Sequence, residues 1–186
     1  MLTQLRNIEH LQRWCLLGWV IGLASQINIA VTLGDFAPKL AALQLAPTYA
    51  SFQNNIATWT VSDVERFYAH FGLDLLHPVL YSVALSLNLA WGFRATGLAA
   101  RYNVWLSAPL IAGCLDLIEN CAHYVAVSMY QPYSGALPEP PWWTFGVGCT
   151  AAKIKWLIAL CTLAALPALA WRARRLAATS DHRHVD

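Results

Sequence analysis

Apolar residues along this chain gather in four long stretches, and most of the charged residues lie between these stretches or at the two ends. A helix needs about 20 mainly apolar residues to cross the hydrocarbon core of a membrane. Four stretches reach that length, so the pattern predicts four transmembrane helices. They are residues 14–33, 62–93, 104–130 and 145–171.

The connection between the first two spans, residues 34–61, is unusually apolar for a loop, yet prolines interrupt it. This combination favours a segment at the membrane surface, as an interfacial lid or a re-entrant loop. Ser62 and Glu65 then have the three-residue spacing of a capping box, which predicts that a helix starts there. That helix is longer than a membrane requires, and Pro78 is the expected site of a kink.

The composition agrees with this pattern, because 58% of the residues are hydrophobic and only 12% are charged. These values exclude an ordinary soluble domain. No repeat or change in composition divides the chain, so residues 1–186 are expected to form a single membrane domain. We predict an all-α integral membrane protein, a four-transmembrane-helix bundle with an interfacial external loop at residues 34–61.

The basic residues predict how the chain is oriented. Most of them lie before the first span, between the second and third, and after the fourth, while the first external segment carries only Lys39 and Arg66, so the positive-inside rule places both termini in the cytoplasm. The tail that follows the fourth span, residues 172–186, is therefore expected in the cytoplasm. We expect the membrane to be a bacterial inner membrane. The net charge of +2 is small and no basic patch stands apart from these segments, so a nucleic acid is not an expected partner. The basic clusters are Arg6 with Arg13, Arg94 with Arg101, and Arg172 with Arg174 and Arg175.

Ionisable residues nevertheless occur inside the second and third spans. Each costs roughly 2.5–3.5 kcal/mol near the membrane centre, so residues of this kind are functional by default. At about 100° per residue, each set falls on one face of its helix. The second span carries His70, Asp74, His77 and Tyr81, and the third carries Asp116, Glu119, Asn120 and His123.

The second and third spans run in opposite directions, so the deepest polar residues of one should meet the deepest of the other. In the fourth span, Lys153 lies at the level expected for Glu119, whereas Lys155 points to a different side. This polar layer is expected to face the interior of the bundle, away from lipid. The predicted close pairs are His77 with Asp116, Asp74 with Glu119, and His70 with His123.

Three imidazoles and three carboxylates on facing helices are donors of the kind found in metal centres of helical bundles. Zinc, iron or manganese suits such a mixture of nitrogen and oxygen donors, and an open coordination position would activate water or dioxygen. We therefore predict a divalent metal site in the outer half of the bundle. The expected ligands are His70, Asp74, His77, Asp116, Glu119 and His123.

The predicted function is metal-dependent or acid–base chemistry on a lipid or another hydrophobic small molecule. Without a metal, buried carboxylates, imidazoles and an amine can still move protons in a pocket that lipid can enter. Haem is disfavoured, because acidic residues adjoin His77 and His123, the two candidate axial ligands. The expected catalytic residues are Asp116, Glu119 and Lys153.

Three other interpretations stay open at this stage. The polar residues can hold the helices in register, with a carboxylate paired to a lysine. They can mark the path of a proton-coupled or ion-coupled transporter, although few ionisable groups extend into the cytoplasmic halves of the spans. The chain can also be a non-catalytic subunit of a larger membrane complex, with protein partners or as a homo-oligomer.

Overall fold

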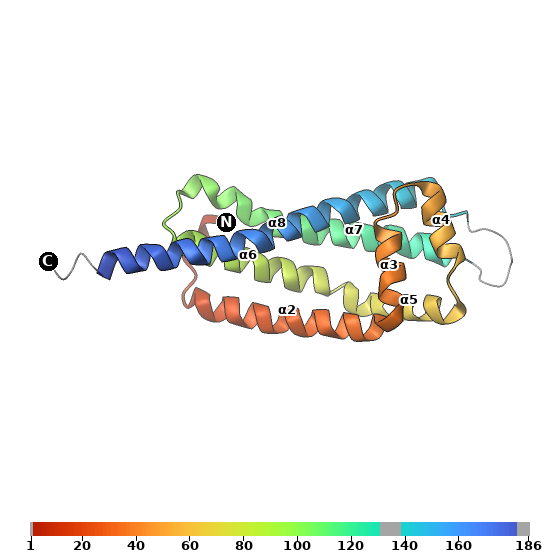
Figure 1. Cartoon of the computed structure of the whole chain (residues 1–186), viewed down its shortest axis with the longest axis horizontal. Helices are drawn as coiled ribbons and strands as arrows, with labels where there is room; N and C mark the ends of the chain where they lie inside the picture. Colours follow the sequence, from red (N-terminus) through yellow and green to blue (C-terminus); the bar gives the residue numbers. More distant parts are fainter. Residues whose placement is uncertain (1, 131–138, 182–186) are drawn as a thin grey trace.

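The computed structural model describes residues 2–130 and 139–181, and all regular secondary structure in those ranges is helical. Four long helices run along the length of the molecule (Figure 1). They are α2 (Leu11–Leu33), α6 (His77–Ala95), α7 (Ala108–Ser128) and α8 (Trp142–Asp181). The shorter elements are α1 (Leu2–Leu5), η1 (Gly34–Phe36), α3 (Ala37–Gln44), α4 (Tyr49–Ala57), α5 (Val61–Asp74) and η2 (Ala100–Ser107).

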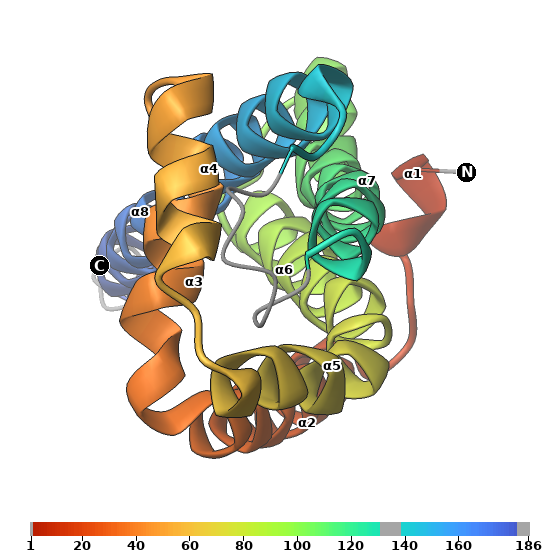
Figure 2. The ribbon, with the colours of Figure 1, turned by 90° about the vertical axis from the view of Figure 1, so that its right-hand side faces the viewer.

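The long helices do not pack equally against one another. Helix α7 packs along α8 and also on α6, whereas α2 packs on α5 and α6. In the end-on view, α2 and α8 lie on different sides of the molecule, with α6 and α7 beside them (Figure 2). Helix α6 therefore contacts all three of the other long helices. Helices α2 and α8 both contact α6 but do not pack against each other.

Three helical segments are long and apolar enough to cross a membrane: Leu11–Gln44, Ala100–Ser128 and Trp142–Ala178. A fourth span is present if α5 and α6, which meet at a bend of 44°, are counted together. Large apolar side chains such as Val31 and Leu157, 76% and 64% exposed, lie on the outside of these helices. A surface of that kind is consistent with an integral membrane protein.

The second predicted span is broken rather than continuous. Helix α5 ends at Asp74 and α6 begins at His77, so the bend lies in the turn just before Pro78, where a proline, which cannot donate to the carbonyl four residues earlier, interrupts a helix. Pro78 is the second residue of α6, a position whose N–H has no partner within the helix. The proline thus helps to start the second helix of the pair.

The predicted capping box at Ser62 and Glu65 is wrong, because the box lies two residues earlier. Thr60 has an extended backbone, its hydroxyl accepts a hydrogen bond from the Asp63 N–H, and the Asp63 carboxylate accepts one from the Thr60 N–H. Ser62 is already inside the helix, where it cannot act as the first cap. Asp63 also forms an ion pair of 2.7 Å with Lys39, which ties α5 to α3.

Residues 34–60 fold over one end of the long helices, and we call this segment the cap (Figures 1 and 2). Its aromatic side chains Phe36, Phe52 and Trp59 are at least 98% buried, and the rings of Phe36 and Trp59 meet edge to face with their centres 4.7 Å apart. The Tyr130 hydroxyl at the end of α7 donates to the Trp59 carbonyl at 3.0 Å. The cap is thus a folded layer with its own apolar core.

Helices α6 and α7 approach closely at Gly113. A Cβ atom built on Gly113 would lie 2.8 Å from the Pro78 carbonyl oxygen and 3.0 Å from the Ser82 Cβ. Contacts this short require the two helices to move apart, because backbone atoms cannot rotate away.

Gly113→Ala should therefore destabilise the protein. Overpacking of this kind typically costs about 1–3 kcal/mol, which exceeds the gain of up to about 1 kcal/mol in helix propensity. The matched control is Gly72→Ala in α5, where a Cβ would meet nothing within 4 Å. Thermal unfolding in detergent should show a lower midpoint for Gly113→Ala only, and equal midpoints for the two variants would contradict this packing.

Candidate functional site

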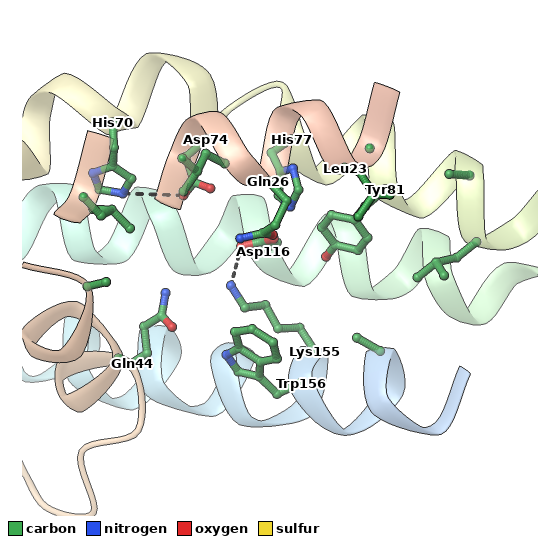
Figure 3. A pocket seen from close by; sticks show the side chains of 18 of the residues that line it. Leu23, Gln26, Gln44, His70, Asp74, His77, Tyr81, Asp116, Lys155 and Trp156 are labelled. Atoms are coloured by element: carbon green, nitrogen blue, oxygen red, sulfur yellow. Dashed lines mark hydrogen bonds and ion pairs between the residues drawn. The ribbon is translucent and has the colours of Figure 1, made fainter. Parts of the chain in front are cut away.

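A cavity of about 400 Å³ lies between α2, α6 and α8, and side chains of α5 and of α3, which belongs to the cap, close one end of it. Most of its wall is apolar, supplied by leucine, isoleucine, alanine and tryptophan side chains. The ionisable groups of the wall come from α5, α6, α7 and α8 (Figure 3). They are His70, Asp74, His77, Tyr81, Asp116 and Lys155.

The break between α5 and α6 positions two of these residues. Asp74 is the last residue of α5 and His77 the first of α6, and both line the cavity. His70 lies one turn before Asp74, with its Nε2 atom 3.8 Å from an Asp74 carboxylate oxygen. The Nδ1 atom of His77 is 3.0 Å from the Ser25 hydroxyl of α2, a hydrogen bond that fixes the ring against the neighbouring helix.

Lys155 is the centre of the charged cluster. Its Nζ atom donates to an Asp116 carboxylate oxygen at 2.5 Å and forms an ion pair of 2.7 Å with Glu119. All three residues are buried, with Glu119 at 0% exposure. An ammonium shared by two carboxylates is the arrangement that makes such burial tolerable, because each charge has an opposite charge beside it.

Asp116 connects this ion cluster to the cavity. Its carboxylate interacts electrostatically with Asp74, His77 and Tyr81. Figure 3 shows His77 and Tyr81 pointing from α6 toward Asp116, and Lys155 reaching the same place from α8. The cavity wall therefore holds two carboxylates, one ammonium, two imidazoles and a phenol within one small region.

Glu119 and His123 lie behind this wall rather than in it. The His123 Nδ1 atom is 3.6 Å from a Glu119 carboxylate oxygen, and its ring lies 5.8 Å from that of Phe52 in the cap. Gly148 of α8 leaves space for this ring, because a Cβ on Gly148 would lie 2.8 Å from His123 Nε2. Neither residue lines the cavity: Glu119 contacts Lys155, and His123 packs beneath the cap.

The prediction that Lys153 is the charge partner is corrected by the structure. Lys153 is exposed and donates to the Ala46 carbonyl of the cap at 3.0 Å, whereas Lys155 faces α7 and binds both carboxylates. The two lysines are about 200° apart around the helix, so only one can face the acids. The sequence did not reveal the rotation of α8 about its axis.

The predicted pairs between helices are found in part. His77 and Asp116 share the cavity wall, as expected. His70 and His123, expected to meet, instead pair within their own helices, His70 with Asp74 and His123 with Glu119. Asn120, which belongs to the same polar face, donates to the Asp74 carbonyl at 3.4 Å and so helps to hold the end of α5.

Several cavity residues were missed by the sequence reasoning. Gln26 in α2 and Gln44 in α3 both line the cavity, and Figure 3 shows them beside Lys155 and the polar wall. An amide in the middle of a predicted span was a usable signal for Gln26. No signal was available for Gln44, because the fold of the cap determines its position.

The predicted metal ligands are divided by this arrangement into a cavity set, His70, Asp74, His77 and Asp116, and a buried set, Glu119 and His123. Among residues 2–130 and 139–181, no group of three or more His, Cys, Asp or Glu side chains is arranged to hold a metal ion. Binding of zinc, iron or manganese stays a prediction.

Comparison with known proteins does not indicate a function, so a proposal has to be argued from the cavity. No protein-family model, curated protein or solved structure matches this chain.

Lys155→Met should destabilise the protein strongly, because it leaves Asp116 and Glu119 buried without a cation. Breaking a buried pair in this way costs about 3–5 kcal/mol. Lys153→Met, a change of the same size on the same helix, removes an exposed lysine with a single bond to the cap and should cost much less. Unfolding midpoints in detergent, measured for both variants, test the assignment, and a larger loss for Lys153→Met would contradict it.

Proposed function

We propose that this protein binds an amphipathic molecule from the membrane in the cavity between α2, α6 and α8. The observation that carries the proposal is the form of this cavity: a mainly apolar space of about 400 Å³ whose ionisable groups all come from α5, α6, α7 and α8. That volume lies in the range of small-molecule sites, about 300–1,000 Å³, and a few convergent polar groups in an apolar pocket are typical of them.

The proposed membrane arrangement gives such a molecule a way in. We propose that α2, the α5–α6 pair, α7 and α8 all cross the membrane as a four-helix bundle. Both described ends of the chain lie opposite the cap (Figure 1), and the three arginine clusters of the sequence belong to that end, which supports a cytoplasmic location for it. Helices α2 and α8 pack on α6 rather than on each other, so a lipid-soluble molecule can enter between them.

The charges of the cavity wall indicate which polar group the ligand carries. Asp74 and Asp116 offer acceptor oxygens, while the only ammonium in the wall, Lys155, is already engaged by Asp116 and Glu119. Carboxylates accept hydrogen bonds and do not donate them when ionised. A hydroxyl or amine group, which donates, therefore fits this wall better than a carboxylate or phosphate.

Gly22 allows a test that leaves every polar group in place. It lines the cavity, and a Cβ built on it would meet nothing within 4 Å, so a large side chain there fills space that the ligand needs. Gly72 in α5 is equally open but does not line the cavity, so it provides the control.

Gly22→Phe should weaken binding of a long-chain alcohol or amine by at least tenfold, while Gly72→Phe should leave it unchanged. Binding to purified protein in detergent can be followed by native mass spectrometry, with thermal unfolding to verify that both variants fold. Equal binding by wild type and Gly22→Phe would show that the ligand does not occupy this cavity.

A second candidate function is acid–base catalysis on the bound molecule. The hydrogen bonding of the two ring nitrogens of His77 favours it. Its Nδ1 atom is held by Ser25, and within residues 2–130 and 139–181 its Nε2 atom has no hydrogen-bond partner. The ring lines the cavity close to Asp116, which can share a proton with it. An imidazole fixed at one nitrogen and free at the other is suited to proton transfer.

If catalysis occurs, His77→Gln should reduce it by roughly a hundredfold while preserving binding. The readout is deuterium incorporated from heavy water into membrane lipids or their products, followed by mass spectrometry. Ser25→Ala, which removes the fixing bond but keeps the imidazole, should have a smaller effect. Equal deuterium incorporation by wild type and His77→Gln would exclude His77 as the acid–base residue.

A further inference from the structure

A second, smaller cavity continues the first along the same helices. It has a volume of about 230 Å³ and lies toward the end of the molecule opposite the cap. On α6 the wall of the first cavity includes Ala84 and Leu85, and the wall of the second begins one turn later at Asn88. On α8 the first cavity reaches Leu163 and the second begins at Leu166.

Trp19 of α2 is the one residue that lines both cavities. Because the two cavities follow each other along both α6 and α8, the Trp19 side chain occupies the junction between them. We call the two cavities together the groove, and the Trp19 side chain borders both of them.

The indole ring is held in this position by hydrogen bonds. Its Nε1 atom donates to the Asn88 side-chain oxygen at 3.0 Å, and the Asn88 amide nitrogen donates to the Ala84 carbonyl at 2.8 Å. Both polar atoms of the Asn88 side chain are thus used, one to fix the amide on its own helix and one to hold Trp19. In a membrane an indole N–H without a partner is costly, so this bond favours the observed position.

The second cavity suits a hydrocarbon chain. Apart from the Asn88 amide and the indoles of Trp19 and Trp91, its side chains are apolar, including Leu166 and Leu169. The polar wall at Asp74 and Asp116 belongs to the first cavity only. A molecule with its polar group at that wall would extend its apolar chain along the groove toward Trp19.

We infer that Trp19 limits the length of the apolar chain that the cavity accepts, with Asn88 as the residue that positions the indole. This inference rests on the proposed function, since it assigns the ligand's chain to the same groove. Removing the indole joins the two cavities and allows a longer chain to be buried. Each additional buried methylene should raise affinity about fourfold, the equivalent of about 0.8 kcal/mol.

The test is binding of straight-chain alcohols from octanol to octadecanol to purified protein in one detergent, by native mass spectrometry. In the wild type, affinity should rise with chain length and then stop rising when the chain reaches Trp19. In Trp19→Ala the rise should continue to longer alcohols, with gains of about fourfold for each added methylene. Partition of the alcohols into detergent micelles is the same for every variant, so the comparison isolates the groove.

Trp156→Ala is the matched control, because Trp156 lines the first cavity but not the second. It should leave the limiting chain length unchanged. Asn88→Leu keeps the indole but removes its acceptor, and should shift the limit in the same direction as Trp19→Ala, which provides a second measurement if Trp19→Ala folds poorly.

The outcomes separate the two proposals. The same limiting length in wild type, Trp19→Ala and Asn88→Leu would overturn the role of Trp19 and leave the proposed function standing. A shift equally large in Trp156→Ala would also overturn it. Absence of binding by any of these alcohols, and by the amines of the same chain lengths, to the wild type would refute both proposals.

Discussion

The ion pairs that Lys155 forms with Asp116 and Glu119 are the interaction on which the rest of the site depends. They bring three charges into a part of the molecule where few polar groups are tolerated, and they fix the rotation of α8 against α7. If α8 were rotated so that Lys153 faced the acids, the cap would lose its bond to Lys153 at Ala46. One rotation of α8 about its axis therefore satisfies both contacts: Lys155 pairs with the acids on one face, and Lys153 bonds the cap on another.

The break between α5 and α6 has a comparable effect on the cavity. It allows Asp74 at the end of one helix and His77 at the start of the next to line one space together with Asp116. The polar wall is thus built from four helices, whereas the apolar wall comes mainly from α2, α3, α6 and α8. An amphipathic ligand matches this division, since its polar and apolar parts would each face a surface of the same kind.

The membrane-compatible helices and the polar faces could be predicted from the sequence, because both depend on periodicity within one segment. Residues 14–33 and 145–171 lie within α2 and α8, and the polar residues of the second and third predicted spans do converge in space. Periodicity also placed His77 beside Asp116.

Features that depend on contacts between segments could not be predicted in this way. Which of Lys153 and Lys155 faces the carboxylates of α7 depends on the rotation of α8 about its axis. The two lysines lie on different sides of that helix, and the sequence of α8 alone does not indicate which side faces α7. Thr60 rather than Ser62 begins α5 because Asp63 bonds both the Thr60 backbone and Lys39 of α3. The cavity itself arises because α2 and α8 pack on α6 and not on each other. This arrangement of three helices cannot be predicted from the sequence of any one of them.

The most direct test of a ligand-binding cavity is to identify what the protein retains when it is extracted from its own membrane in mild detergent. Native mass spectrometry, with chemical analysis of the released compounds and elemental analysis of the same sample, gives both the stoichiometry and the chemical class. We expect one amphipathic molecule per chain with a hydroxyl or amine group. A stoichiometric divalent metal with no organic ligand, or only bulk lipid in the proportions of the membrane, would contradict it.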